Sequence, residues 1–371
     1  MNWKILQIVL TPLMLLWMAI FSAFALLTAR LTRPDIFFSI TVEPSLRKSA
    51  ASQAILRQFS QTIILFTLIG LALTLSGGFA GLMPVLGVGL ILVGAALDFG
   101  GIILAYATAR RQVRPHQVEP SREREVVVKP RPTRPVGGWL GQAGPFLILG
   151  LAALCLWWRW DAIPDQFPIH WDLHGRPDGW AIKSGRSVFG SVLVGTLICL
   201  FFSLLFNGFA RGARHIHSSG PDAEKESRFL RTMMLMVLGL EYCMAAMFGF
   251  GVSPILPPRL MAIFVMAPGL VGVAIVVVAI RMGQGGWRLR GQTPASTPGN
   301  QAPAGDRTPD ECWKWGLFYY NPADPALWVE KRFGIGWTFN FGNPRAWFVL
   351  GGILLFATAV PVLSILLLGS K

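Results

Sequence analysis

Long apolar stretches alternate with polar segments along the whole chain. A bilayer core about 30 Å thick is crossed by a helix of about 20 apolar residues. Eight stretches approach or reach that length, near residues 5–28, 62–76, 83–107, 140–158, 188–209, 232–251, 260–280 and 347–368. This pattern predicts an all-α fold, that of a polytopic integral membrane protein with eight transmembrane helices.

Two shorter segments between the apolar stretches have the period of a β-strand. In residues 35–43 every second position from Ile36 to Val42 is apolar, and residues 336–341 alternate in the same way. A period of two is typical of a strand with one buried face. We therefore expect small extramembrane β-like segments, and we expect these two to pair into a sheet against the membrane.

The basic residues of the loops predict how the helices are oriented. Positive charge is retained on the cytoplasmic side of a membrane. The loops at 30–61, 108–139, 210–231 and 281–346 contain 26 Lys and Arg residues, whereas the segments on the opposite side contain 7. We therefore expect both chain termini to lie outside the cytoplasm.

The composition agrees with a membrane protein and excludes other classes. Hydrophobic residues make up 53% of the chain and charged residues only 14%, whereas a soluble globular chain has about 25% charged residues. The net charge of +14 would suit a nucleic-acid-binding protein, but the mean hydropathy of +0.52 would not. We therefore expect the lipid bilayer as a partner and no nucleic acid.

The spans and loops divide the chain into membrane regions and linkers. The membrane regions are expected at 1–107 with three helices, 140–209 with two helices around an extracytoplasmic loop at 159–187, 210–280 with two helices, and 348–369 with the last helix. The regions between them are a basic, proline-rich cytoplasmic linker at 108–139, a linker at 281–311 whose composition predicts disorder, and an aromatic-rich cytoplasmic module at 312–347.

The loop at 159–187 carries the main candidate binding residues. Apolar residues from Phe167 to Leu173 alternate with polar ones, so an extended chain would place the titratable groups on one face. The sequence Arg176-Pro177-Asp178-Gly179 then has the residues that a type I turn prefers. The candidate binding residues are His170, Asp172, Asp178 and Lys183.

A metal site in this loop is an open alternative. His170, Asp172 and His174 have the side chains that Zn²⁺ binds. In a strand the two histidines would be roughly 13 Å apart, too far for one ion. A helix would bring them together, but Pro168 and Gly175 disfavour one. We expect no cofactor, and the three residues remain candidate metal ligands only.

Two acidic residues lie within the apolar stretches. Asp98 is near the middle of the third stretch and Glu241 near the middle of the sixth. A charged residue at that depth costs about 2.5–3.5 kcal/mol on insertion scales, and such residues often mark ion or proton paths. The alternative is that partners such as Tyr106 or Tyr242 satisfy them and that they only fix helix packing.

The loop at 159–187 and the apolar stretches beside it also resemble a known protein family. Residues from Pro164 to Lys183, including Pro168-x-His170-Trp171 and Pro177-Asp178-Gly179, resemble the signature of "domain of unknown function 1648", over about 139–209. His174 departs from that pattern, which usually has a small or amide residue there. The resemblance implies a bacterial cytoplasmic membrane protein, similar to the SdpI-like immunity and signalling proteins.

A second resemblance covers residues 312–347. The segments Trp313 to Pro322, Asp324-Pro325, Val329 to Thr338 and Asn340-Phe341 are similar to another short module, "domain of unknown function 5808". Neither resemblance implies a reaction.

The chain lacks the common catalytic signatures. No phosphate-binding loop G-x-x-x-x-G-K-[ST], no H-E-x-x-H and no G-x-S-x-G occurs, so we expect a non-enzymatic protein without catalytic residues. Our leading hypothesis is envelope sensing or immunity, in which the 159–187 loop meets an extracytoplasmic peptide or toxin and the 312–347 module relays to or anchors a cytoplasmic protein. The alternatives are a proton-coupled secondary transporter that uses Asp98 and Glu241, and a metal-dependent membrane enzyme.

Overall fold

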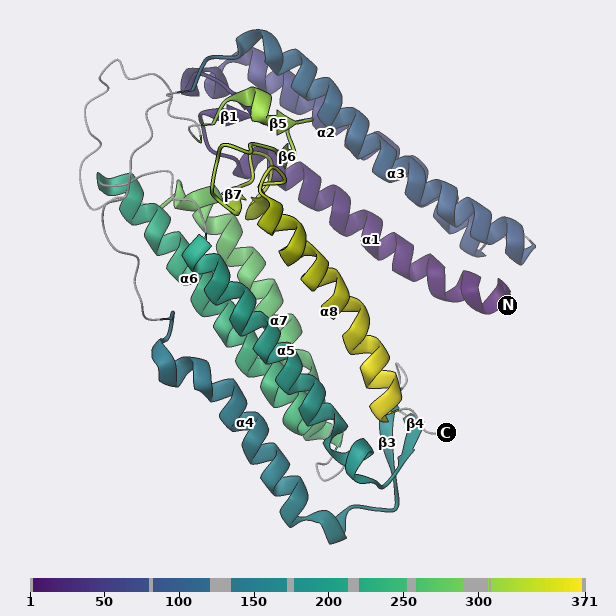
Figure 1. The fold of residues 1–371 in the computed structure, drawn as a ribbon. Coiled ribbons are helices and arrows are strands. Elements are labelled where there is room, and N and C mark those ends of the chain that lie inside the picture. Colours follow the sequence, from purple (N-terminus) through teal and green to yellow (C-terminus); the bar gives the residue numbers. More distant parts are fainter. Residues whose placement is uncertain are drawn as a thin grey trace.

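The computed structural model describes residues 3–79, 83–120, 135–171, 177–212, 220–251, 258–289, 306 and 308–368. Eight long helices make up most of this part of the chain (Figure 1). They are α1 (Trp3–Leu31), α2 (Ala50–Phe79), α3 (Pro84–Val113), α4 (Gly138–Trp158), α5 (Gly185–Gly212), α6 (Gly220–Ala246), α7 (Pro258–Met282) and α8 (Pro344–Leu368). All eight include a stretch long and apolar enough to cross a membrane, which confirms the predicted all-α polytopic architecture.

Several helices are longer than the apolar stretches that predicted them. Helix α2 begins at Ala50 rather than near residue 62, and α6 begins at Gly220 rather than near 232. Hydropathy identifies only the apolar part of a helix. A polar extension beyond that part is stabilised by tertiary packing, which hydropathy does not record. In α2 the extension buries Ser52, Ile55 and Phe59 on one face.

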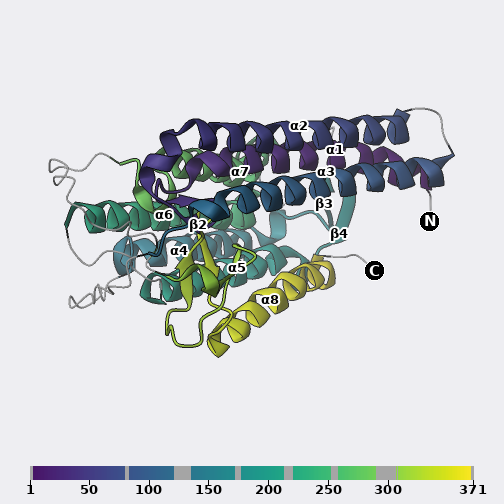
Figure 2. The same ribbon diagram turned by 90° about the horizontal axis from the view of Figure 1, so that it is seen from above.

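The helices form two groups. Helices α1, α2 and α3 pack against one another, and α4, α5, α6 and α7 form a second group, with α8 against α5 (Figures 1 and 2). The contact of α8 includes the stacked rings of Phe201 and Phe356, whose centroids are 3.9 Å apart. Most of α8 is otherwise exposed and apolar, as expected for a helix surrounded by lipid.

The small hairpins lie at opposite ends of the helices. Strands β3 (Gln166–Trp171) and β4 (Pro177–Ile182) form a hairpin at the end where α1 begins and α8 ends, which we call the hairpin side (Figures 1 and 2). The other end, which we call the module side, contains β1 (Ile36–Phe37), β2 (Ile40–Thr41), β5 (Trp313–Lys314), β6 (Phe318–Tyr319), β7 (Trp328–Glu330) and β8 (Trp337–Phe339).

The expected sheet between residues 35–43 and 336–341 does not form. Strand β1 pairs with β2, and β8 pairs with β7, each in its own antiparallel hairpin. Residues 35–43 turn back at Phe38 and Ser39, which have positive φ angles of 43° and 65°. The hairpin is buried on both faces, so its alternating pattern did not reflect one buried and one exposed side.

A module at the C-terminal side of the chain joins the two helix groups. We call its described residues, 306 and 308–343, the bridging module. Phe333 packs among rings from the first group, 4.7 Å from Tyr106 and 5.7 Å from Phe38 between centroids. Trp337 packs against the second group, 4.7 Å from Phe209 and 5.6 Å from Phe229. The relative position of the two groups is therefore tied to this module.

The two predicted linkers are described only in part. Residues 121–134 of the 108–139 linker, and residues 290–305 and 307 of the 281–311 linker, lie outside the described residues. The second linker is shorter than the sequence predicted, because the residues at both of its ends are packed against the rest of the protein. Gln284 is buried beside Gly336, and Thr308 is buried beside Arg332.

Close approach of α2 and α3 depends on pairs of glycines. A Cβ atom added to Gly94 would lie 2.5 Å from the carbonyl oxygen of Gly70, and one added to Gly77 would lie 2.5 Å from that of Gly87. In a membrane no hydrophobic force drives helices together, so they associate through close packing. Small residues allow their backbones to approach closely. These pairs therefore set the distance between α2 and α3.

We predict that Gly94→Ala lowers the thermal stability of the protein by several degrees, because the new methyl group must push the two backbones apart. Thermal unfolding of the full chain in detergent, followed by circular dichroism, measures this. Gly89→Ala is the matched control, since nothing lies within 4 Å of its added Cβ. Alanine favours a helix over glycine by up to about 1 kcal/mol, so the control should be neutral or stabilising. Equal melting temperatures for the two variants would contradict the prediction.

Candidate functional site

The loop predicted to bind a ligand forms the β3–β4 hairpin. Phe167 pairs with Ala181, and both side chains are buried against helices α4 and α5. The extended conformation expected from the alternating pattern is therefore present. The expected turn at Arg176 to Gly179 is wrong in its position, because Pro177, Asp178 and Gly179 belong to β4. Register shifts near His170 allow this pairing, and residues 172–176, which connect the strands, lie outside the described residues.

Lys183 lies at the base of the hairpin. Its Nζ donates a hydrogen bond of 3.0 Å to the carbonyl oxygen of Ile163 and lies 5.2 Å from the ring centroid of Trp160. Its backbone nitrogen donates to the carbonyl oxygen of Asp165. These contacts hold the hairpin to the end of α4, and a role of Lys183 in ligand binding stays a prediction.

The structure does not describe the side chains of the other candidate binding residues. Asp172 and His174 lie outside the described residues, and so do the side chains of His170 and Asp178. No three His, Cys, Asp or Glu side chains come together as a metal site in the part of the chain that the structure describes. That search does not include the candidate ligands His170, Asp172 and His174, so the metal alternative stays open.

Large apolar side chains are exposed around the hairpin. Trp180 and Ile182 of β4 are 43% and 65% exposed, and Trp157 and Trp158 at the end of α4 are also exposed. Tryptophan is enriched where a membrane meets water, because its ring is apolar and its N–H is polar. The hairpin and the adjoining end of α4 therefore share an exposed surface of large apolar side chains.

Asp98 is satisfied within the first helix group. Its side chain is buried, and its Oδ1 accepts hydrogen bonds from Ser22 of α1 (2.9 Å) and Thr67 of α2 (2.7 Å). The partners suggested by the sequence are wrong: Tyr106 donates to Ser39, and Tyr242 donates to the carbonyl oxygen of Gly141. Asp98 thus connects all three helices of its group.

Glu241 is in a different situation. Its side chain is 3% exposed, and its Oε2 has no hydrogen-bond partner among the described residues. It lines a small pocket between α4, α5 and α6, together with Val136, Gln142, Phe206, Asn207, Met234, Val237 and Leu238. Buried polar groups nearly always have a partner, so this unpaired oxygen marks the pocket as a candidate site. The structure places Asp98 and Glu241 in separate helix groups and does not bring them together.

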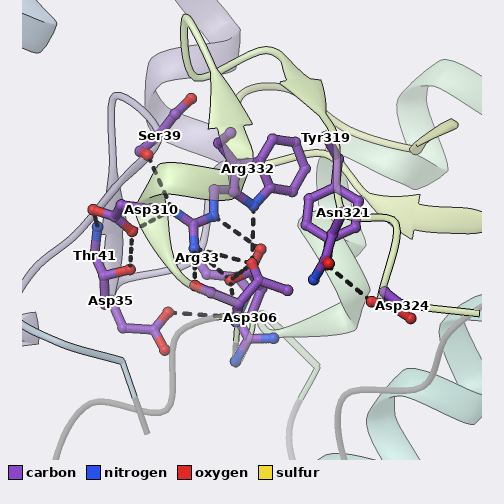
Figure 3. A network of polar contacts seen from close by, with 12 residues as sticks. Arg33, Asp35, Ser39, Thr41, Asp306, Asp310, Tyr319, Asn321, Asp324 and Arg332 are labelled. Atoms are coloured by element: carbon purple, nitrogen blue, oxygen red, sulfur yellow. Dashed lines mark hydrogen bonds and ion pairs between the residues drawn. The ribbon is translucent and has the colours of Figure 1, made fainter. Parts of the chain in front are cut away.

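The bridging module is organised around a fully buried arginine. Arg332 makes a bidentate ion pair with Asp306, with hydrogen bonds of 2.9 and 2.7 Å, and a second ion pair with Asp310 (Figure 3). It also donates to the carbonyl oxygens of Ser39 and Thr308. Burial by itself lowers the pKa of this guanidinium, but the two carboxylates outweigh burial and raise the pKa above its ordinary value.

The Arg332 network also fixes a strained turn. Phe38 has a positive φ angle, which is rare for a bulky residue. The carbonyl oxygen of Phe38 accepts from Arg110, and that of Ser39 accepts from Arg332. Thr41 donates its hydroxyl to Asp310. Strained backbone persists only where its surroundings over-determine it, and here both sides of the turn are held.

Glu330 is a second buried charge in the module. Its Oε2 has no hydrogen-bond partner among the described residues. Burial raises the pKa of Glu330 to about 7, and the nearby Glu226 acts in the same direction, whereas Arg33 and Gln284 act against it. The carboxyl group therefore changes protonation near neutral pH.

Reasoning from the sequence missed the pocket and the arginine network. Gln142, Ser203 and Asn207 are polar residues within apolar stretches, and that rarity was a signal for the pocket. No comparable signal pointed to Arg332, because Asp306 and Asp310 lie in the segment predicted to be a disordered linker.

The comparisons with known proteins agree with both predicted resemblances. Residues 147–195 match the family model "Domain of unknown function (DUF1648)", and residues 322–347 match "Family of unknown function (DUF5808)". The first segment covers most of α4, the β3–β4 hairpin and the start of α5, and the second covers β7, β8 and the start of α8. No match emerged among the curated proteins, and none emerged among the solved structures.

We predict that Glu330 makes the protein less stable as the pH rises. Its pKa is raised above the ordinary value of 4.5, so between about pH 4.5 and 7 the folded state keeps a proton that the unfolded state has lost. The contribution of Glu330 to the free energy of unfolding is therefore fully present below pH 4.5 and is lost as the pH rises through 7. Glu330→Gln should remove this dependence and raise the melting temperature at pH 8 by a few degrees.

Melting temperatures of the full chain in detergent between pH 5 and 8 measure this effect. Glu311→Gln, which changes an exposed glutamate of the same module, should keep the wild-type profile. A Glu330→Gln profile parallel to that of the wild type would show that the carboxyl group does not titrate in this range.

Proposed function

We propose that the protein is a non-enzymatic sensor or immunity protein of the bacterial cytoplasmic membrane, in which the β3–β4 hairpin meets an extracytoplasmic peptide and the bridging module responds on the cytoplasmic side. One observation carries the proposal: helix α5 is packed against the hairpin at its start and against the module at its end. A single rigid element therefore contacts both proposed working parts of the protein.

The contact at the hairpin side is a small apolar core. Val188 and Val192 of α5 are buried with Phe167 and Ala181 of the hairpin. The rings of Trp160 and Phe189 stack, with centroids 6.2 Å apart. A peptide that displaced the hairpin would therefore act directly on the first turns of α5.

The contact at the module side is aromatic. Phe209, near the end of α5, is buried and lies 5.4 Å from Trp328 and 4.7 Å from Trp337 between ring centroids. Trp337 also contacts Phe229 of α6. A shift or rotation of α5 would have to be accommodated by the module, since packed interfaces rearrange rather than deform continuously.

The proposed orientation is supported by the distribution of charge. The loops on the module side carry most of the 33 Lys and Arg residues, and the positive-inside rule then assigns the module side to the cytoplasm and both termini to the outside. On this orientation the exposed surface around Trp180 faces arriving peptides. A cytoplasmic protein that reads the module is part of the same proposal.

A second candidate function is proton-coupled secondary transport. The observation that favours it is Glu241, a buried acid with an unpaired oxygen in a membrane-spanning helix. Asp98 would act as a second proton carrier, through the hydroxyl groups of Ser22 and Thr67.

We predict that cells expressing the full chain tolerate a membrane-active peptide better than cells without it, and that His170→Ala and Asp178→Ala reduce the tolerated concentration at least fourfold. Phe209→Ala should cause a similar loss at equal protein level, because it breaks the contact between α5 and the module. Leu204→Ala, at an exposed position of α5, is the control. The proposal loses its support if expression gives no tolerance to any such peptide, or if the hairpin variants behave like the wild type.

The transport hypothesis makes a separate prediction. Glu241→Gln should abolish proton-driven uptake into vesicles that contain the purified protein, because glutamine cannot release a proton, whereas His170→Ala should leave uptake intact. Accumulation of a labelled substrate under an imposed pH gradient is the measurement. Uptake that persists in Glu241→Gln rules out this residue as the carrier.

A further inference from the structure

We infer that the module-side ends of α1 and α7 form a binding site for an anionic phospholipid. Three arginines, Arg30, Arg281 and Arg288, would bind its phosphate, and the apolar faces of the two helices would contact its acyl chains. The membrane spans within these helices end at Leu31 and Met282. Arg30 and Arg281 directly precede these two residues, so both lie at the module-side boundary of the membrane. The inference does not depend on the proposed sensing function.

Arg288 brings the two helix ends together. Its Nη2 donates a hydrogen bond of 2.8 Å to the carbonyl oxygen of Arg30, and its Nη1 donates one of 3.0 Å to that of Ile280. The last turns of α1 and α7 therefore lie on either side of one guanidinium group. Trp287, whose ring centroid is 5.1 Å from Arg288 Cζ, donates its Nε1–H to the carbonyl oxygen of Leu31. A tryptophan in this position is typical of the headgroup level of a membrane.

The three arginines concentrate positive charge at this point. All three are exposed, and none forms an ion pair with a carboxylate among the described residues. The bonds of Arg288 to the carbonyl oxygens offset the partial negative charge of the two helix ends. A guanidinium has five N–H donors, so the remaining donors of Arg288 and those of Arg30 and Arg281 can bind phosphate oxygens. The net positive charge favours an anionic lipid over phosphatidylcholine, whose headgroup carries its own positive charge.

An exposed apolar surface continues from each helix end into the membrane. Leu27 precedes Arg30 by three residues and Val277 precedes Arg281 by four, so each lies on the same helix face as its arginine. Both are exposed, and so is Leu270, two turns before Val277. Helix α1 packs on α2 and α3, whereas α7 packs on α6, and Figure 1 shows α1 and α7 separating towards the hairpin side. Acyl chains can therefore lie along both helices below a headgroup, a contact that a soluble phosphate cannot make.

The test is native mass spectrometry of the full chain in detergent, titrated with phosphatidylglycerol or with phosphatidylcholine of the same acyl chains. One phosphatidylglycerol should bind at least fivefold more tightly than phosphatidylcholine. The double variant Arg30→Gln with Arg281→Gln should lose this preference, and it should fold normally because both side chains are exposed. The matched control is Arg57→Gln with Arg111→Gln, which removes the same charge from exposed positions of α2 and α3 at the module side. The control should bind phosphatidylglycerol like the wild type.

A competition experiment separates a lipid from a free phosphate. Glycerol 3-phosphate in tenfold excess should leave the bound phosphatidylglycerol in place, because it has no acyl chains. The inference is overturned if the wild type binds the two lipids equally, or if the double variant in α1 and α7 keeps the preference. It is also overturned if the control loses the preference to the same extent, which would indicate attraction by overall charge, or if glycerol 3-phosphate displaces the lipid.

Discussion

Arg332 is buried without access to water, and the module side of the protein is arranged to satisfy it. Its three guanidinium nitrogens donate to two carboxylates and to backbone carbonyls, including that of Ser39 in the first helix group. Removing one partner of a buried ion pair costs about 3–5 kcal/mol, because the other charge stays behind unpaired. The connection between β7 and β8, which contains Arg332 and Phe333, is therefore fixed, and with it the position of Trp337 at the start of β8.

This fixed connection matters because helices in a membrane are not driven together by hydrophobicity. Helices α1 to α3 are held to one another by glycine contacts and by the hydrogen bonds of Asp98. Their connection to the second group is made mainly at the module side, where Phe333 and Trp337 contact different groups. The module thus connects the two helix groups.

The two acids within the membrane show how similar sequence signals lead to different structures. Asp98 has hydroxyl partners on both neighbouring helices, so its burial is accounted for by packing. Glu241 lines a pocket and has an oxygen without a partner among the described residues. The rarity of charge at membrane depth marked both residues equally, and only the tertiary structure shows that their surroundings differ.

The sequence by itself determined which segments cross the membrane and that residues 166–171 are extended, because hydropathy and alternation are local properties of the chain. It also indicated Asp98, Glu241 and both family resemblances. It misplaced the turn at Pro177 to Gly179, since local turn preference was overridden by pairing with β3. Only the tertiary structure decided the partners of Asp98, the pocket at Glu241 and the Arg332 network. Ser22 is 76 residues from Asp98, and Ser39 is 293 residues from Arg332. Contacts over such separations depend on how whole helices pack, and no local pattern records them.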